Sequence, residues 1–247
     1  MNQITLTGMV LQSGPIGEYD RRVVLLTRER GKISAFARGA RKPNSPLVGV
    51  TSPFTFGEFT VYEGRTSYTL VSASVSNYFQ ELRMDVEAAY YGFYFCEFAS
   101  YLAREANDET ELLKLLYQTL KALTSPSLSK PLIRNIFELR AMTINGEGPQ
   151  VFECISCGDR EREKIFSIRR GGLLCQECAT HVTDGRKLHP STLYAMQFIC
   201  STPISRLYTF ALTEEVQKEL ELIVELYLDH YLGKKFKSLE ILETLIR

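Results

Sequence analysis

The residues with the clearest chemistry are four cysteines in the stretch ECISCGDREREKIFSIRRGGLLCQEC. Cys154 and Cys157 form one CxxC pair, and Cys175 and Cys178 form a second. A CxxC turn points two thiolates at one centre, so two such turns can complete the tetrahedron that Zn²⁺ prefers. Because four thiolates leave no open coordination position, we expect one structural zinc ion per chain and no metal catalysis.

Other interpretations of these thiols remain open. The cysteines could be incidental thiols or a redox pair, and His181 lies close enough in sequence to replace one cysteine as a ligand. The residues KIFSIRRGGLL between the two pairs can form the hairpin that brings the turns together. Cys96 and Cys200 lie in apolar, helix-like surroundings, where a cysteine is usually an inert core residue.

Catalytic patterns are hard to find elsewhere. The sequence contains neither a dinucleotide-binding fingerprint nor a GxxxxGK[ST] phosphate loop. None of the three histidines is paired with a recognisable nucleophile. We therefore predict that the protein is not an enzyme, although an enzyme of nucleic-acid metabolism with unrecognised catalytic residues remains an alternative.

A second chemical feature is concentrated positive charge. The chain has a formal net charge of zero, yet residues 21–42 include eight basic residues and one acidic residue. Such cations neutralise phosphates, and Tyr19 and Phe36 could offer stacking faces for bases. The predicted nucleic-acid-binding residues are Arg21, Arg22, Arg28, Arg30, Lys32, Arg38, Arg41 and Lys42.

The elements that carry this charge read as strands. Residues 1–78 contain about five short segments rich in β-branched and aromatic residues, with a tight turn at 29–31 and a hairpin loop at 63–67. This count predicts a five-stranded barrel of the OB type, a fold that binds nucleic acid along one face, and an SH3-like barrel is the nearest competitor.

Residues 79–247 read as helices, which carry a zinc-binding segment at 150–182. Helix starts are predicted at Asp108, Ser129 and Thr213, and stops at Gly146 and Gly233. We expect these helices to pack as a bundle, which makes the predicted fold α+β. The aromatic residues between 90 and 98 are expected to form packed core rather than a stacking platform.

The sequence resembles the RecO family of bacterial recombination mediators. The resemblance lies in GEYDRRVVLLTRERGKISAFARGARKPNSPLVG, PLIRNIFELRAMTINGEGPQVFECISCG, GGLLCQECA and KSLEIL, in this order along nearly the whole chain. It implies an OB barrel, a helical domain, binding to single- and double-stranded DNA, and annealing of complementary strands in recombinational DNA repair. It also implies partnership with RecR and with single-stranded DNA-binding protein in loading RecA. Some members lack the four cysteines, which this chain keeps.

The resemblance further implies that the helical domain receives the acidic, phenylalanine-ended tail of single-stranded DNA-binding protein. Such a tail needs an apolar pocket and cations, and the stretch SKPLIRNIFELRAM offers Lys130, Arg134, Phe137 and Arg140. The alternative is that Phe137 and its apolar neighbours are core and that the arginines pair with nearby acids.

The function classes that remain are few. No apolar run reaches the length needed to span a bilayer, and the N-terminus lacks a signal-like pattern. We expect a cytoplasmic, nucleoid-associated protein without a membrane partner. The main alternative to a DNA-binding mediator is an RNA-binding or ribosome-associated zinc protein.

Overall fold

The computed structural model describes residues 2–65 and 67–246, which form two compact units. The first unit comprises Met1–Thr124 and Phe236–Arg247, and the second comprises Ser125–Lys235. These units are groups of residues that pack together, and they do not test which parts of the chain fold separately. The predicted division into domains at 1–78 and 79–247 therefore stays a prediction.

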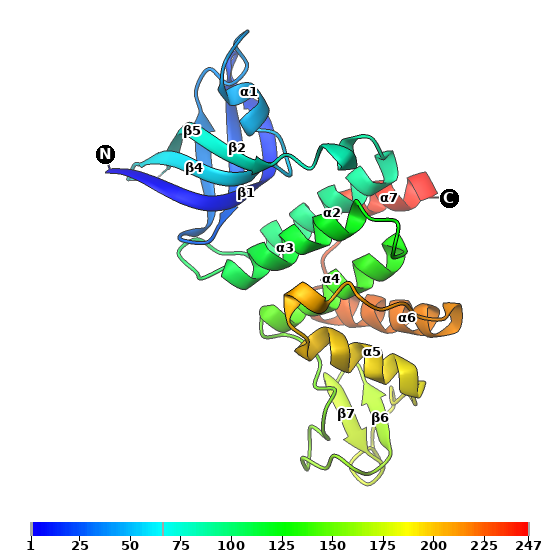
Figure 1. The fold of residues 1–247 in the computed structure, drawn as a ribbon. Coiled ribbons are helices and arrows are strands. Elements are labelled where there is room, and N and C mark those ends of the chain that lie inside the picture. Colours follow the sequence, from blue (N-terminus) through cyan, green and yellow to red (C-terminus); the bar gives the residue numbers. More distant parts are fainter. Residues whose placement is uncertain (1, 66, 247) are drawn as a thin grey trace. The chain divides into compact units, whose positions relative to one another are not determined.

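A closed five-stranded barrel forms the N-terminal part of the first unit (Figure 1). The strands are β1 (Asn2–Ile16), β2 (Asp20–Thr27), β3 (Gly31–Ala37), β4 (Phe56–Glu63) and β5 (Tyr68–Asn77). They follow the order β1-β2-β3-β5-β4, and only β3 and β5 pair in parallel. The predicted OB-type barrel is therefore confirmed, while Thr66 of the predicted hairpin loop lies outside the described residues.

The sequence pattern of the strands explains the barrel core. Burial alternates along β3, where Ile33, Ala35 and Ala37 point inward. The long strand β1 pairs with both β2 and β4, and Gly8 lies in both pairings. A Cβ at Gly8 would lie only 2.5 Å from the carbonyl oxygen of Leu26, so a larger residue would not fit there. The short helix α1 (Leu47–Val50) contributes its two terminal side chains to the same core.

Helices of the first unit follow the barrel. They are η1 (Gln80–Arg83), α2 (Val86–Leu102), α3 (Thr110–Leu123) and α7 (Lys237–Ile246). Most of the aromatic side chains of α2 are buried, but Phe93 is 39% exposed. The predicted cap of α3 at Asp108 is off by one residue, because the N-cap is Glu109. The Asp108 carboxylate accepts the N–H of Thr110, the first residue of the helix.

The second unit holds α4 (Lys130–Ile144), α5 (Pro190–Ser201), η2 (Ile204–Arg206) and α6 (Glu214–Tyr231), with a hairpin of β6 (Lys164–Ser167) and β7 (Gly172–Cys175). Ser129 caps α4 as predicted, since its side chain accepts the N–H of Leu132. Pro131 lies in the first turn of that helix, where its missing N–H costs nothing. Within residues 2–65 and 67–246, no helix has the length and apolar character needed to cross a membrane.

Candidate metal centre and nucleic-acid interface

The four cysteines of the two CxxC pairs converge on one point. The Sγ atoms of Cys154, Cys157, Cys175 and Cys178 all lie within 4.8 Å of one another, and those of Cys157 and Cys175 are 3.7 Å apart. A tetrahedron with Zn–S bonds of about 2.3 Å has edges of about 3.8 Å. The cluster therefore fits a metal ion held by four thiolates, and His181 is not part of it.

Backbone hydrogen bonds position both cysteine pairs. The first turn is closed by the bond from Gly158 N to Cys154 O, and Gly158 has a φ of +72°, which favours glycine. The second turn begins at the last residue of β7, where Cys178 N donates to Cys175 O. A bond from Ile155 N to Leu173 O joins the first turn to β7.

The same turns favour the ionised form of the first cysteine in each pair. Burial raises the pKa of Cys154, but backbone N–H groups around the turn outweigh this effect and bring that pKa to about 6. The backbone N–H of Cys178 likewise lowers the pKa of Cys175. The second cysteine of each pair shows the opposite shift. The backbone N–H of Asp159 lowers the pKa of Cys157, but the hydrogen bond with Cys154 and burial outweigh it and raise that pKa, and hydrogen bonds with Cys175 and Cys157 raise the pKa of Cys178. Each turn by itself therefore favours one thiolate, and a bound metal ion would stabilise all four, because metals bind thiolates rather than thiols.

The second candidate site is the basic loop, which we define as residues 38–46 between β3 and α1. Arg38, Gly39 and Lys42 line a shallow hollow of about 430 Å³ together with residues 43–46. The loop is fixed by its backbone, because Gly39 N donates to the Asp20 carboxylate and Arg41 N donates to Tyr19 O. The side chains of Arg38, Arg41 and Lys42 are exposed, and Lys42 Nζ lies 5.7 Å from the centre of the Tyr19 ring.

Two more of the predicted cations lie at this end of the barrel but are engaged with the protein. Arg21 donates to Thr51 Oγ1 at 2.9 Å and so braces the end of α1. Arg22 donates to Ser34 Oγ at 2.7 Å across the β2–β3 pair. Phe36, a predicted stacking residue, pairs with Arg22 in the sheet and is half-buried.

The remaining three predicted cations lie at the opposite end of the β2–β3 hairpin. Arg28 pairs with Glu29 at 2.9 Å, and Arg30 lies 3.7 Å from Glu63. Lys32 Nζ donates to Ser100 O at 2.6 Å, and burial lowers the pKa of this lysine. The structure thus brings five of the eight predicted cations together and separates the other three from them.

The residues proposed to receive a partner tail lie on α4, where Phe137 is buried and Lys130, Arg134 and Arg140 are half-buried. Phe137 is fully buried, and Arg134 Nε donates to the buried carboxylate of Glu138 at 2.7 Å. Arg140 donates to the carbonyl oxygens of Ile199 and Cys200 at the end of α5. Tail binding by these residues remains a prediction.

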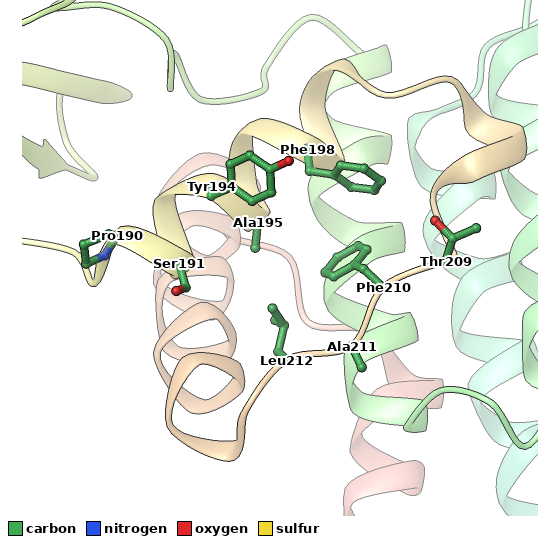
Figure 2. Close-up of a pocket in the computed structure, with 9 residues that line it drawn as sticks. All are labelled: Pro190, Ser191, Tyr194, Ala195, Phe198, Thr209, Phe210, Ala211 and Leu212. Carbon is green, nitrogen blue, oxygen red and sulfur yellow. The ribbon is translucent and has the colours of Figure 1, made fainter.

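An apolar groove, which the sequence did not indicate, lies beside α5 (Figure 2). Its volume is about 600 Å³. It is lined by Pro190, Ser191, Tyr194, Ala195 and Phe198 of α5 and by residues 209–212. The rings of Phe198 and Phe210 pack edge to face at 5.0 Å, and Figure 2 shows Tyr194 beside them at the groove. The sequence does contain a start signal for this helix, because Pro190 lies in its first turn, where proline is favoured, but the groove itself depends on packing against residues 209–212.

Comparisons with known proteins cover almost the whole chain. A family model described as "Recombination protein O N terminal" matches residues 1–79, and one described as "Recombination protein O C terminal" matches residues 83–240. A "DNA repair protein RecO" of Acetivibrio thermocellus is 30% identical over 100% of this chain and 99% of its own length. Proteins of the same name from Halalkalibacterium halodurans and Bacillus subtilis are 30% and 29% identical, each over 96% of this chain and 93% of their own length.

Proposed function

Because the chain belongs to the RecO family of DNA repair and recombination proteins, we propose that it is a recombination mediator that binds single- and double-stranded DNA and anneals complementary strands. The observation that carries the proposal is the basic loop on the OB barrel, with the exposed cations Arg38, Arg41 and Lys42.

The chemistry of the loop suits a phosphate backbone. OB barrels bind strands along one face and between their loops, and they combine cations with aromatic rings. Here the loop backbone is held by Asp20 and by the backbone of Tyr19, so the backbone itself loses little freedom when the cations meet phosphates. Tyr19 is 44% exposed beside Lys42, where a base could stack on its ring.

Annealing follows from charge neutralisation and requires no covalent step. Two complementary strands repel each other through their phosphates, and a protein that neutralises phosphates on both strands lowers that repulsion. Annealing of this kind needs no active site. We further propose that the protein, together with RecR, helps to load RecA onto strands coated by single-stranded DNA-binding protein.

We assign the metal as zinc with a structural role. Four cysteines whose Sγ atoms lie within 4.8 Å of one another match the ligand set of structural zinc sites, in which no coordination position stays open for a substrate. Its task is to hold the segment 150–182, whose own core is limited to a few apolar residues around the cysteines.

For the tail of single-stranded DNA-binding protein, the groove beside α5 offers what α4 does not. Its aromatic lining suits a phenylalanine ring, whereas Phe137 is fully buried. Arg206 is exposed three residues before Thr209 of the groove lining, and we propose that its guanidinium meets the tail's carboxylates. We propose that the groove beside α5 binds the tail, and the alternative is the site on α4 that the sequence predicts.

The test of DNA binding compares two double variants of the barrel. Arg38→Ala/Lys42→Ala removes two exposed cations of the basic loop, whereas Arg28→Ala/Arg30→Ala removes the same charge from the opposite end. Binding to a fluorescein-labelled single strand is measured over a salt series. The slope of log affinity against log salt concentration should be smaller in the loop variant than in the wild type, by roughly 0.7 for each lost phosphate contact.

The control variant should bind more tightly than the loop variant. Equal affinities in two folded variants would mean that the loop is only a solvated surface. Competition with RNA of the same sequence separates the alternatives, because preferential displacement of DNA by RNA would favour an RNA-binding zinc protein.

A further inference from the structure

The basic residues of the zinc-binding segment and its flank divide into two groups. Four of them form ion pairs with acids of the same segment, for example Arg160 with Glu153 at 2.9 Å and Lys164 with Asp159 at 2.6 Å. The paired residues are Arg160, Arg162, Lys164 and Lys187. Arg169, Arg170 and Arg186 are exposed and form no ion pair within the part of the chain that the structure describes.

Two of these three arginines lie on the tight turn between β6 and β7. The backbone N–H of Arg169 donates to Asp184 Oδ2 at 2.9 Å, and that of Arg170 donates to Ser167 Oγ at 3.2 Å. The turn closes through Gly171, which has a φ of +73° and donates its N–H to Ile168 O. The turn is therefore rigid, while both guanidinium groups remain available at its surface.

The third arginine lies beside the same turn. Arg186 exchanges both backbone hydrogen bonds with Phe166, one residue before Ser167. Asp184, the nearby acid, already accepts from Ser167 Oγ and from the backbone of Arg169. These bonds outweigh the effect of burial and hold the pKa of Asp184 below its ordinary value. Its charge stabilises the turn and offsets only one of three guanidinium groups.

An aromatic side chain borders this cluster. Tyr231, the last residue of α6, donates its hydroxyl to Ile168 O at 3.2 Å, and its ring stacks on Tyr227 at 4.4 Å. Tyr231 is 36% exposed, and exposed Lys234 and Lys235 follow it in the chain. Cations beside an exposed ring are the combination with which proteins hold single-stranded nucleic acid.

We propose that the β6–β7 turn, with Arg169, Arg170 and Arg186, is a second DNA-contact site that binds the phosphate backbone of a strand. Guanidinium groups bind phosphate oxygens through a rigid fork of donors, and three of them beside one turn suit a nucleic-acid backbone, which presents a regular row of phosphates. The inference rests on the proposed DNA-binding function and deepens it. Together with the basic loop, it gives one chain two separate contacts, so each can hold a different strand during annealing.

The test uses two double variants of the full-length, metal-loaded protein. Arg169→Gln/Arg170→Gln removes two charges for which the described residues show no ion pair, and Arg160→Gln/Arg162→Gln removes two ion-paired charges from the same segment. Binding to fluorescein-labelled oligodeoxythymidylate is measured over a salt series, and metal content verifies that the segment is intact. The turn variant should lose roughly 0.7 of salt slope for each phosphate contact, and the paired-charge variant should match the wild type.

The outcomes separate this inference from the proposed function. If the wild type binds DNA and the basic-loop variant weakens it, but the turn variant equals the paired-charge variant, the second site is wrong and the proposed function stands. If the wild type does not bind DNA, the proposed function itself fails.

A measurement on the wild type avoids any effect of substitution on folding. Phenylglyoxal modifies accessible arginines, and mass spectrometry reports the extent of modification at each position. Bound oligodeoxythymidylate should slow the modification of Arg169 and Arg170 relative to that of the ion-paired Arg160. Equal rates at all three positions with and without DNA would overturn the second site.

Discussion

Residues of the same charge play different parts in this chain, because their side chains touch different partners. Lys32 donates to a backbone carbonyl of α2 and is half-buried, so it joins the barrel to a helix. Arg21 braces α1 through Thr51. Arg38 is exposed at the hollow of the basic loop. A count of basic residues therefore locates a charged region, but contacts decide which cations remain for a ligand.

The same distinction applies to the cysteines, and it gives a direct test of the metal centre. Cys175→Ala should release the bound zinc, because only three of the four thiolate ligands remain to coordinate the ion. Cys200→Ala is the matched control, since Cys200 lies outside the cluster and its thiol accepts from Thr143. Metal content of the purified proteins should be about one zinc per chain for the control and near zero for Cys175→Ala. Zinc retained by Cys175→Ala would show that these cysteines are not the ligands.

At the scale of elements, the turn between β2 and β3 depends on a single glycine. Gly31 has a φ of +63°, and a Cβ at this position would lie 2.2 Å from Arg104 O. Gly17 also has a positive φ of +57°, but no atom lies within 4 Å of its added Cβ. The two positions therefore separate backbone strain from steric overlap.

Gly17→Ala should cost about 1 kcal/mol of folding free energy, which is the strain of a left-handed alanine. Gly31→Ala should cost about 2–4 kcal/mol, because overpacking against backbone adds to that strain. Denaturant unfolding measures both changes. Equal losses for the two variants would mean that the contact between the β2–β3 turn and residues 104–107 contributes little.

Strands and capped helices were predictable, because their signals are local. The alternation in β3 and the cap at Ser129 appear directly in the sequence, and the spacing of the four cysteines predicts that they converge on one site. Helices α5 and α7 were not predicted. Helix α7 begins where Glu97 of α2 accepts the backbone N–H of Ser238, a contact between residues 141 positions apart. The groove beside α5 was missed for the same reason, since it depends on how α5 packs against residues 209–212.

The groove yields a prediction of its own. Ala211→Trp places a large ring at an exposed position of the groove lining, whereas Ser201→Trp adds the same ring at an exposed position outside it. Binding of an acidic peptide that ends in phenylalanine, followed by anisotropy, should weaken at least several-fold in Ala211→Trp alone. Equal affinity in both variants, with a loss in Arg134→Ala, would return the tail site to α4.

At the scale of the whole molecule, the chain carries its proposed DNA contacts on two separately packed units. The first unit has a large apolar core inside the barrel, whereas the buried cysteines of the zinc-binding segment lie in a small cluster of their own with Leu174. The two parts should therefore differ in their dependence on metal.

Removal of zinc by a chelator should expose the segment 150–182 while the barrel persists, because only the segment derives its folding energy from the metal. Hydrogen exchange followed by mass spectrometry checks this expectation peptide by peptide. Protection should fall in the segment and stay unchanged in β1–β5. Simultaneous loss of protection in both would mean that the ion supports the whole chain.

We propose that this protein anneals DNA by neutralising phosphates and without turnover of a nucleotide. The most direct test mixes complementary strands coated with single-stranded DNA-binding protein and follows duplex formation by fluorescence, with and without the purified, zinc-loaded protein. We predict that the protein accelerates annealing equally with and without ATP, and that Arg38→Ala/Lys42→Ala slows it. Annealing that requires ATP hydrolysis, or no acceleration by the folded protein, would contradict the account.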